Sequence, residues 1–370
     1  MSTFLFYDDK IINILRNEEK PSGGAAVQAY GWIRGLRELG QDVYVMTNAC
    51  GKDLIKEECR QIPLLPLYDR KKGVRWVRWI YYRLPFIYRQ IRSAQPDYLY
   101  QGIPGWTSFV LGLICKSLKI KYILRISNDF LVDERFYAKY GRTHRFFQWQ
   151  GLKLSDCILC QNEYQYGIIK KEFPNKHAYK ISNPIAFKKI DSLHKQPGKN
   201  YIAWLGLFQY QKNLKLLYEV AFMLKSEKFL VAGKEEESCD NDTRFYLEKL
   251  KELPNVVFPG FLSRDEVLPF LSNAKFLLNT SHYEGFSNTF LEAMSVGTPI
   301  ISSDKVNPDQ IISANKLGIV YNDVDDLIKQ YKSVSEDDYF EMSANVKSYV
   351  HDKHDYRVLS NTLLGILKNN

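Results

Sequence analysis

Residues 276–303 read FLLNTSHYEGFSNTFLEAMSVGTPIISS, and their pattern indicates the fold class. It begins and ends with short apolar runs, FLLNTS and PIISS, which are typical of buried β-strands. Between them NTFLEAMSV has helical periodicity, with Ser287 placed to cap its start and Gly297 to end it before Pro299. A strand, a helix and a second apolar strand in succession indicate a parallel sheet covered by helices.

The same alternation runs through the whole chain. In the first half the strand-like runs are TFLFYD, DVYVMT, DYLYQG, KYILRIS, DCILCQ and AYKISN. In the second half they are YIAWLG, FLVAG, NVVFPG, FLLNTS, PIISS and GIVYN. Two series of this kind predict an α/β protein made of two Rossmann-like domains with parallel sheets. The polar stretch 183–200, which carries two prolines, separates them. We expect domains at residues 1–188 and 189–352, followed by a C-terminal helix at 353–370 that returns toward the first domain.

Composition bounds the class of protein. The chain has 370 residues, 45% hydrophobic and 25% charged, which is ordinary for a globular protein. Its apolar runs are too short to span a bilayer, and its start lacks the pattern of a secretory signal, so we expect a cytoplasmic location. Cys157 and Cys160 form a CxxC pair inside a strand-like run without a second pair, which favours structural packing over metal or redox chemistry.

Positive charge is concentrated in the first half of the chain. Residues 1–190 carry a net charge of +14, whereas residues 191–370 carry −5. The segment 69–93 combines eight lysines and arginines with several aromatic residues. This combination suits a helix that lies on an anionic membrane surface. The alternative is a domain helix with solvated arginines, and Pro85 interrupts the helical pattern. No nucleic-acid-binding motif accompanies the charge.

The ends of the second-half strands carry residues suited to a ligand site. Parallel α/β sheets bind ligands beyond the carboxyl ends of their strands. Here Gly206 and Gly233 each end one strand, Gly260 and Phe261 end another, and HYEGFSN follows FLLNTS. Glycine allows backbone to approach a ligand closely, although any one of these positions could also be an ordinary turn.

Two glutamates flank the predicted helix start near residue 287. Glu284 lies before the helix, the backbone from Phe286 to Thr289 forms its start, and Glu292 lies a turn further on. N–H groups at a helix start bind phosphate oxygens, and carboxylates accept hydrogen bonds from sugar hydroxyls. This order suggests a nucleotide-sugar with its diphosphate between the two carboxylates. In the alternative interpretation, Glu284 is a surface loop residue and Glu292 is a helix residue that balances the macrodipole.

The residues HYEGFSNTFLEAMSVGTPIISSD closely resemble the E-x₇-E signature of retaining GT-B glycosyltransferases of the family 4 type. Other segments are similar to further elements of that family: SGGAAVQAYGWIRGLRELGQDVYVMT, LSDCILCQNEYQ, KISNPI and WLGLFQYQKNLKLLYEVA. The resemblance covers most of the chain. It implies the GT-B fold, with an acceptor-binding N-terminal domain and a nucleotide-sugar-binding C-terminal domain facing each other across a cleft.

The resemblance implies a role for each matching residue. Glu284 would hold hydroxyls of the donor sugar, Glu292 the ribose, and Lys212 the phosphates. Gly23 and Gly24 would approach the diphosphate from the N-terminal domain. We expect catalytic residues Glu284, Lys212, Asn128 and Asp129. The expected donor-binding residues are Gly23, Gly24, Gly206, Lys212, Gly233, Phe261, Glu284, Gly285, Phe286, Ser287, Asn288, Thr289 and Glu292.

Three positions depart from the family pattern. Leu207 stands where the family usually has an arginine on the diphosphate, and Lys234 and Arg264 are the candidates to replace it, with a surface charge as the alternative for each. The usual histidine of the N-terminal domain is absent, and the strand end reads RISND, which places Arg125, Ser127, Asn128 and Asp129 there. Packing or capping would explain these four residues as well as catalysis does. KVNPDQ replaces a frequent glycine pair after Asp304.

The resulting expectation is a retaining hexosyltransferase that needs no metal and no cofactor other than its donor, a UDP- or GDP-sugar. The acceptor would be a saccharide, lipid-linked at the inner membrane face, in the assembly of a bacterial surface polysaccharide such as O-antigen or capsule. The alternatives are a non-catalytic, membrane-associated binding protein of the same fold and a GT-B sugar-nucleotide epimerase.

Overall fold

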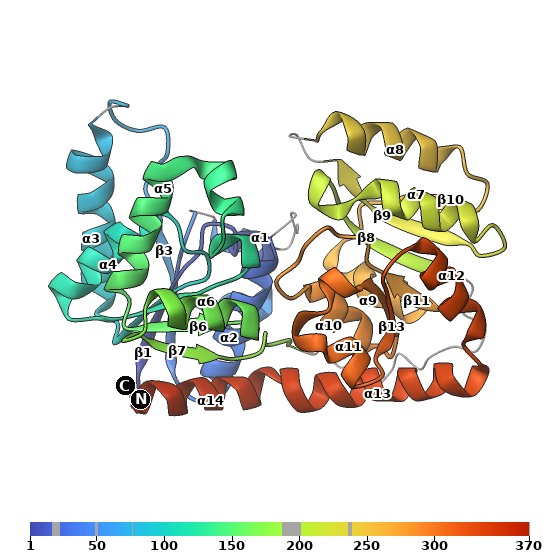
Figure 1. Cartoon of the computed structure of the whole chain (residues 1–370). Helices are drawn as coiled ribbons and strands as arrows, with labels where there is room; N and C mark the ends of the chain where they lie inside the picture. Colours follow the sequence, from blue (N-terminus) through green and yellow to red (C-terminus); the bar gives the residue numbers. More distant parts are fainter. Residues whose placement is uncertain (17–22, 49–50, 76, 187–200, 236–238, 370) are drawn as a thin grey trace. The chain divides into compact units, whose positions relative to one another are not determined.

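The protein is described by a computed structural model that covers residues 1–16, 23–48, 51–75, 77–186, 201–235 and 239–369. The chain divides into two compact units. Unit 1 comprises Met1–Ala186 and Tyr356–Asn370, and unit 2 comprises Phe187–Asp355. Each unit is a parallel sheet with helices packed on it, as Figure 1 shows.

Unit 1 contains a seven-stranded parallel sheet within the described residues, in the order β3-β2-β1-β4-β5-β6-β7. Its strands are β1 (Thr3–Tyr7), β2 (Asp42–Thr47), β3 (Leu64–Pro66), β4 (Tyr98–Gln101), β5 (Lys121–Arg125), β6 (Cys157–Cys160) and β7 (His177–Lys180). The six strands predicted from the sequence are all present. β3 was not predicted, because it has three residues and prolines at 63 and 66, which is a pattern that suits only an edge strand.

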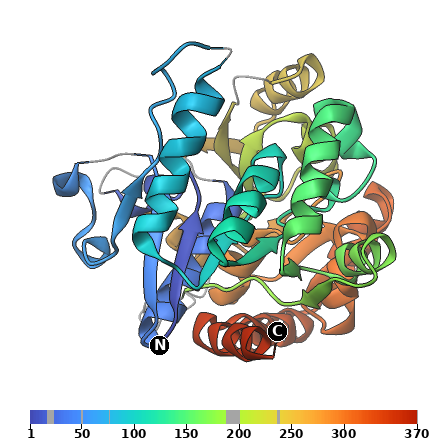
Figure 2. The same ribbon diagram turned by 90° about the vertical axis from the view of Figure 1, so that its left-hand side faces the viewer.

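Helices pack on both faces of the unit 1 sheet because its strand residues alternate between two cores. Phe4 and Phe6 of β1 face one core, and Leu5 between them faces the other. The first core includes α2 and α14, and the second includes α3, α4 and α5, which lie side by side in Figures 1 and 2. The α-helices are α1 (Ile12–Leu15), α2 (Gly24–Glu38), α3 (Leu84–Ala94), α4 (Trp106–Leu118), α5 (Arg135–Leu154), α6 (Glu163–Glu172) and α14 (Tyr356–Lys368). The shorter helical turns are η1 (Lys52–Leu54), η2 (Glu57–Cys59), the π-helical η3 (Trp79–Arg83) and η4 (Asp129–Leu131).

The basic segment 69–93 does not form one continuous helix. Its helical part consists of the π-helical turn η3 and α3, and the described residues before Arg78 are turns, bends or irregular. Pro85 lies in the first turn of α3, where its missing N–H is tolerated, so this proline starts the α-helix and does not break it.

Unit 2 contains a six-stranded parallel sheet within the described residues, in the order β10-β9-β8-β11-β12-β13. Its strands are β8 (Ile202–Phe208), β9 (Phe229–Glu235), β10 (Val256–Gly260), β11 (Phe276–Leu278), β12 (Ile300–Ser303) and β13 (Gly318–Tyr321). Its α-helices are α7 (Leu214–Met223), α8 (Asn241–Lys251), α9 (Arg264–Ser272), α10 (Asn288–Ser295), α11 (Ile311–Ala314), α12 (Val324–Ser333) and α13 (Glu336–His354). The shorter turns are η5 (Tyr210–Lys212), η6 (Asp304–Val306) and η7 (Pro308–Gln310). The six predicted strands are all present.

The strand order of unit 2 reverses direction beside β8. The chain runs outward from β8 to β9 and β10, and then returns to place β11 on the other side of β8. Loops that leave two neighbouring strands in opposite directions open a crevice at the carboxyl edge of the sheet, which is where α/β sheets bind ligands. The residues after β8 and β11 therefore meet at this edge.

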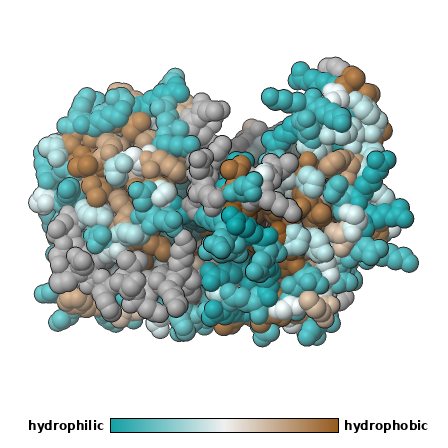
Figure 3. All heavy atoms as spheres, turned by 180° about the vertical axis from the view of Figure 1, so that it is seen from behind, coloured by the Kyte–Doolittle hydropathy of each residue, from teal (hydrophilic) through white to brown (hydrophobic). Residues whose placement is uncertain are grey.

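No helix of the described residues is long and apolar enough to cross a bilayer. On the face shown in Figure 3, hydrophilic side chains cover much of the surface and hydrophobic ones lie between them in small groups.

Candidate functional site

Lys212 and Glu284 meet at the carboxyl edge of the unit 2 sheet, although they lie 72 positions apart in the sequence. Lys212 ends the turn η5 after β8, and Glu284 lies in the loop after β11. The Lys212 Nζ donates a hydrogen bond to Glu284 Oε1 at 2.6 Å, and the two side chains are 15% and 11% exposed. The pairing of β8 with β11 brings the two loops together, so the sheet order produces this contact.

Hydrogen bonds fasten the two loops to each other. The Thr280 hydroxyl donates to the backbone carbonyl of Lys212 at 2.7 Å and accepts from the indole of Trp204 at 3.0 Å. The backbone N–H of His282 donates to the carbonyl of Gln211 at 2.8 Å. The ring of Tyr210 stacks on His282 with a centroid separation of 4.8 Å. Lys212 and Glu284 are therefore held by a rigid frame before any ligand arrives.

Two of the three glycines predicted at the strand ends, Gly206 and Gly233, have clear packing reasons, whereas a Cβ on Gly260 would meet no described atom within 4 Å. A Cβ on Gly206 would lie 3.3 Å from the Lys212 side chain, so this glycine makes room for the lysine stem. A Cβ on Gly233 would lie 1.9 Å from the carbonyl oxygen of Gly206, its partner on the neighbouring strand. Gly233 is thus required by the sheet itself, whether or not a ligand approaches it.

The helix α10 begins beside Glu284, as the sequence predicts. Ser287 is its N-cap residue with extended backbone angles, and the Phe290 N–H donates to the Ser287 carbonyl at 3.1 Å. The Ser287 hydroxyl does not cap the helix; it is hydrogen-bonded to the Thr289 hydroxyl at 2.7 Å. N–H groups in a first helical turn have no carbonyl four residues earlier to bind, which suits them to an anion. The ring of Phe286 packs against the ring of His354, with their centroids 5.1 Å apart.

Glu292 is buried on α10 and has an arginine partner. The Arg264 Nη1 donates to Glu292 Oε1 at 2.5 Å, and the glutamate side chain is 10% exposed. Arg264 is the first residue of α9, whose start is fixed by a capping box between Ser263 and Glu266. The sequence gives no signal for this pair, because the two residues lie 28 positions apart on different helices.

Lys234 lies beside the leucine that replaces the family arginine. In the β8–β9 register Lys234 is the direct partner of Leu207, so both side chains leave the same face of the sheet. The Lys234 ammonium lies 5.4 Å from the ring centroid of Phe261, which is exposed at the end of β10. Arg264, the other candidate, is paired with Glu292.

The predicted residues of unit 1 have local structural partners. Gly23 is the N-cap residue of α2, and a Cβ added to it would meet no described atom within 4 Å, so its packing does not demand glycine. The Asn128 side chain caps η4 by accepting from the Phe130 N–H at 3.2 Å. The Asp129 carboxylate accepts from Asn162 at 3.0 Å and Gln165 at 2.8 Å. Burial raises the pKa of Asp129 in spite of these two donors.

Cys157 and Cys160 are free, buried thiols within β6, and burial raises the pKa of both. A raised pKa keeps a thiol protonated and unreactive, which supports the interpretation of structural packing. Among the described residues, no group of three histidine, cysteine or carboxylate side chains has the placement of a metal site.

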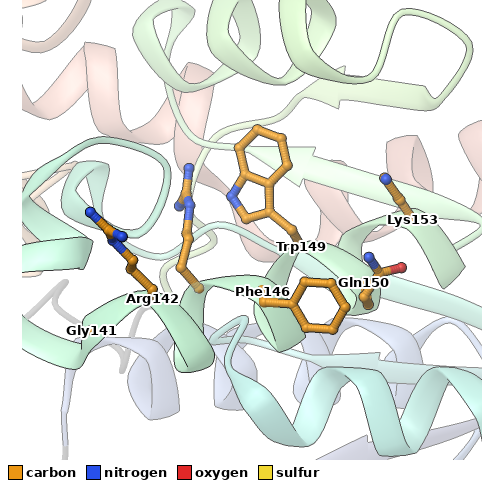
Figure 4. A pocket seen from close by; sticks show the side chains of 7 residues that line it. Gly141, Arg142, Phe146, Trp149, Gln150 and Lys153 are labelled. Atoms are coloured by element: carbon orange, nitrogen blue, oxygen red, sulfur yellow. The ribbon is translucent and has the colours of Figure 1, made fainter.

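A hollow of about 850 Å³ lies along α5 in unit 1. Figure 4 shows its lining, which consists of Gly141, Arg142, Arg145, Phe146, Trp149, Gln150 and Lys153. α5 is kinked at Gly141, which has a φ of 75°. None of these residues was predicted to bind the donor, and the hollow is distinct from the Lys212–Glu284 site in unit 2.

An exposed apolar group lies in the basic segment of unit 1. Val74, Val77, Ile80 and Leu84 are exposed, with Ile80 at 74% and Val74 at 64%. Arg83 is buried in the same segment, with its guanidinium 4.6 Å from the ring centroid of Tyr68. The segment thus combines apolar side chains in solvent with a high density of cations.

Comparison with known families matches nearly the whole chain. Residues 186–352 match the family described as glycosyl transferases group 1, and residues 22–188 match the family described as Glycosyltransferase Family 4. The two matches meet at the boundary between the two sheets.

Individual relatives are more distant. A putative glycosyltransferase of Acidianus filamentous virus 2 is 32% identical over 59% of this chain and 72% of its own length. An alpha-monoglucosyldiacylglycerol synthase of Streptococcus pneumoniae is 29% identical over 36% of this chain and 30% of its length. An uncharacterised 41.2 kDa protein in the cps region of Klebsiella pneumoniae is 24% identical over 52% of this chain and 55% of its length. The chain spans less than two thirds of the length of the last two.

Solved structures share the fold over the full chain. The Anabaena protein HepE in complex with UDP-glucose superposes with a TM-score of 0.77 at 13% identity, and all of both chains is covered. At this identity the likeness establishes the two-domain GT-B fold.

Proposed function

Because the chain belongs to the glycosyl transferases group 1 family, we propose that it moves a hexose from a nucleotide-diphosphate sugar to a saccharide acceptor with retention of configuration. The single observation that carries this proposal is the Lys212–Glu284 contact at the carboxyl edge of the unit 2 sheet, directly before the start of α10. This contact brings the Lys212 ammonium and the Glu284 carboxylate together beside the N-terminus of α10. Those three groups match a phosphate, a sugar hydroxyl and a second phosphate, respectively.

Each group of the donor has a proposed partner in unit 2. The start of α10 from Phe286 to Thr289 binds the diphosphate, and Lys212 neutralises its charge. Glu284 accepts hydrogen bonds from hydroxyls of the transferred sugar. Glu292 accepts from the ribose hydroxyls, and Arg264 orients its carboxylate through the hydrogen bond at 2.5 Å. The UDP-glucose bound to HepE, which has the same fold, favours a UDP-sugar as the donor.

The proposed reaction is a front-face displacement. The bond between the sugar C1 and the diphosphate oxygen breaks, and the acceptor hydroxyl oxygen bonds to C1 from the same side. The proton of that hydroxyl passes to a phosphate oxygen of the leaving group. Lys212 and the N–H groups at the start of α10 stabilise the negative charge that grows on the diphosphate, which is the step that a fixed site accelerates most.

We propose that Lys234 supplies the charge that the family arginine supplies elsewhere. Its place opposite Leu207 in the β8–β9 register supports this assignment, since paired residues project from the same face of a sheet. The ring of Phe261, against which the ammonium lies, would keep the lysine at the edge of the nucleotide site.

The proposed acceptor is a lipid-linked saccharide in bacterial surface-polysaccharide assembly, bound by unit 1 at the inner face of the membrane. Two features support a membrane surface: the net charge of +14 over residues 1–190 and the exposed apolar side chains at Val74, Val77, Ile80 and Leu84. Such side chains enter the headgroup region while cations bind anionic lipid. The names of two relatives, a glucosyldiacylglycerol synthase and a cps-region protein, are consistent with this acceptor class.

Donor turnover tests the function directly. The protein is incubated with UDP-glucose or GDP-mannose, with and without a membrane lipid extract, and released nucleoside diphosphate is measured. We expect release with one donor, stimulated by the extract. No release with any nucleotide-sugar that binds would favour a binding protein of the same fold, and conversion of the donor into its epimer would favour an epimerase.

Liposome co-sedimentation tests the membrane surface. Vesicles of phosphatidylglycerol should bind the protein at low salt, and phosphatidylcholine vesicles should not. Ile80→Ser should weaken this binding several-fold. Phe340→Ser removes a comparably exposed apolar side chain from unit 2 and should leave binding unchanged. Equal binding by all three proteins would refute the assignment of this surface.

A further inference from the structure

The chain passes between unit 1 and unit 2 twice, and within unit 1 both of these crossing segments contact helix α2. The first segment follows β7, and Pro184 lies against Gly31 of α2, where a Cβ would be 2.8 Å from the Pro184 carbonyl oxygen. The second begins at Tyr356, the first residue of α14, whose hydroxyl donates to Glu38 of α2 at 2.7 Å. A Cβ on Gly35 would be 2.6 Å from the Tyr356 carbonyl oxygen. Figure 1 shows α14 running beside α2.

The same helix begins at the glycine pair expected to meet the donor. Gly23 is its N-cap residue and Gly24 its first residue. Any displacement of α2 along or about its axis therefore moves this pair, because an α-helix transmits motion as a rigid element.

A buried arginine, Arg125, connects α2 to the crossing segment that follows β7 through hydrogen bonds. Arg125 ends β5 and is fully buried. Its Nη2 donates to the carbonyl of Ile181 at 3.1 Å and to the side chain of Asn183 at 2.5 Å, both in the first crossing segment. Its Nε donates to Gln28 of α2 at 3.3 Å, and Gln161 after β6 donates to the same Gln28 oxygen at 3.0 Å. One guanidinium thus joins the sheet, the crossing segment and α2.

The arginine is an energetically unfavourable way to make this connection. Its hydrogen-bond acceptors are neutral oxygens, and its Nη1 has no hydrogen-bond partner among the described residues. Burial lowers the pKa of Arg125, as expected for a cation that is removed from water and donates to neutral acceptors. The ring of Trp32, 5.5 Å from the guanidinium carbon, offsets a part of that cost. In some proteins a buried polar group of this kind enforces one specific arrangement of the chain at a cost in stability, and the contacts of Arg125 suit that role.

We propose that Arg125 is a positioning residue for the transfer reaction: it fastens α2 to the first crossing segment and so holds Gly23 and Gly24, at the start of α2, in the position that turnover requires. This inference rests on the proposed function and on the expectation from the sequence that the glycine pair approaches the donor diphosphate. It predicts that the loss of Arg125 impairs turnover and spares nucleotide binding, because the nucleotide partners proposed above all lie in unit 2.

Arg125→Met tests the inference against Arg145→Met as a matched control. Arg145 is also a buried arginine of unit 1 that donates to backbone carbonyls, but these belong to Leu131 and Val132 at the end of η4 and not to the crossing segment. For each variant the thermal midpoint, the Kd of the nucleoside diphosphate and the kcat and KM of donor hydrolysis are measured. We expect both variants to lose thermal stability. Arg125→Met should also lower kcat by about 10- to 100-fold, as small misplacements of reacting groups do, with the Kd within about twofold.

Asn183→Asp keeps the proposal testable if Arg125→Met fails to fold. This change places a carboxylate against the guanidinium and preserves the connection. We expect a higher thermal midpoint at pH 7, a gain that disappears near pH 3, and kcat within about twofold of wild type. A lower midpoint at pH 7 would show that Arg125 already has a counter-charge and would overturn the reasoning, as would equal kcat losses in the Arg125 and Arg145 variants. Absence of turnover in the wild-type protein would instead refute the proposed function.

Discussion

Removal of the Lys212 side chain should damage the site in two measurable ways. The Lys212 Nζ lies 2.6 Å from Glu284 Oε1, in a contact where neither side chain is more than 15% exposed. In Lys212→Ala, the Glu284 carboxylate keeps its hydrogen bond from the Ser281 hydroxyl at 3.0 Å but loses the cation. The free protein therefore carries a poorly compensated buried charge, and the donor complex lacks a charge on its diphosphate.

The magnitudes follow from these two losses. Removal of one partner from a buried ion pair costs about 3–5 kcal/mol, and each kcal/mol lowers the midpoint of a unit of this size by about 2–4 °C. Removal of one fixed group that stabilises charge in the transition state lowers kcat by about 10²- to 10³-fold. Glu284→Gln should lower kcat to a similar degree, because a neutral amide accepts weaker hydrogen bonds from the sugar hydroxyls.

A double-mutant cycle separates the effects. The assay is release of nucleoside diphosphate from the donor, with thermal unfolding measured in parallel. The double variant Lys212→Ala/Glu284→Gln should be more stable than the sum of the single losses predicts, since no unpaired charge is left behind. Lys316→Ala breaks the exposed ion pair with Glu341 and should change neither quantity. Turnover within threefold of wild type in both single variants would refute the site.

Three further outcomes are expected. Gly233→Ala should unfold unit 2 or lower its midpoint strongly, because the added Cβ would lie 1.9 Å from the Gly206 carbonyl oxygen; unchanged thermal unfolding would contradict this packing. Arg264→Ala should weaken nucleoside diphosphate binding about tenfold by freeing the Glu292 carboxylate, a change that calorimetry would detect. Burial raises the pKa of Asp8 to about 6, above its unfolded value, so its ionisation destabilises the folded protein as the pH rises from about 4 to 6. Asp8→Asn should therefore raise the thermal midpoint above pH 6 and leave it unchanged near pH 4.

The sheets follow from local pattern. Each of the twelve predicted strands is present, because a buried parallel strand needs a continuous apolar run, and such runs are visible in the sequence. β3 was not predicted, because a strand of three residues that follows Pro63 and ends with Pro66 gives too short a signal. The limits of the helix in segment 69–93 could not be predicted, because the composition of the segment does not reveal where the backbone starts to turn.

Local patterns in the sequence are enough to assign the fold class and the family and to propose which chemical groups form the site. Strand periodicity acts over a few residues, and the motif around Glu284 and Glu292 lies within a single loop and helix. The partners of these groups become visible in the folded chain alone: Lys212 pairs with Glu284, Arg264 pairs with Glu292, and Lys234 lies beside Leu207. The folded structure also shows that Arg125, at the end of β5, is hydrogen-bonded to Gln28 of α2 and to Asn183 of the crossing segment. These contacts join segments far apart in the chain, and they depend on strand order, which local sequence patterns do not encode.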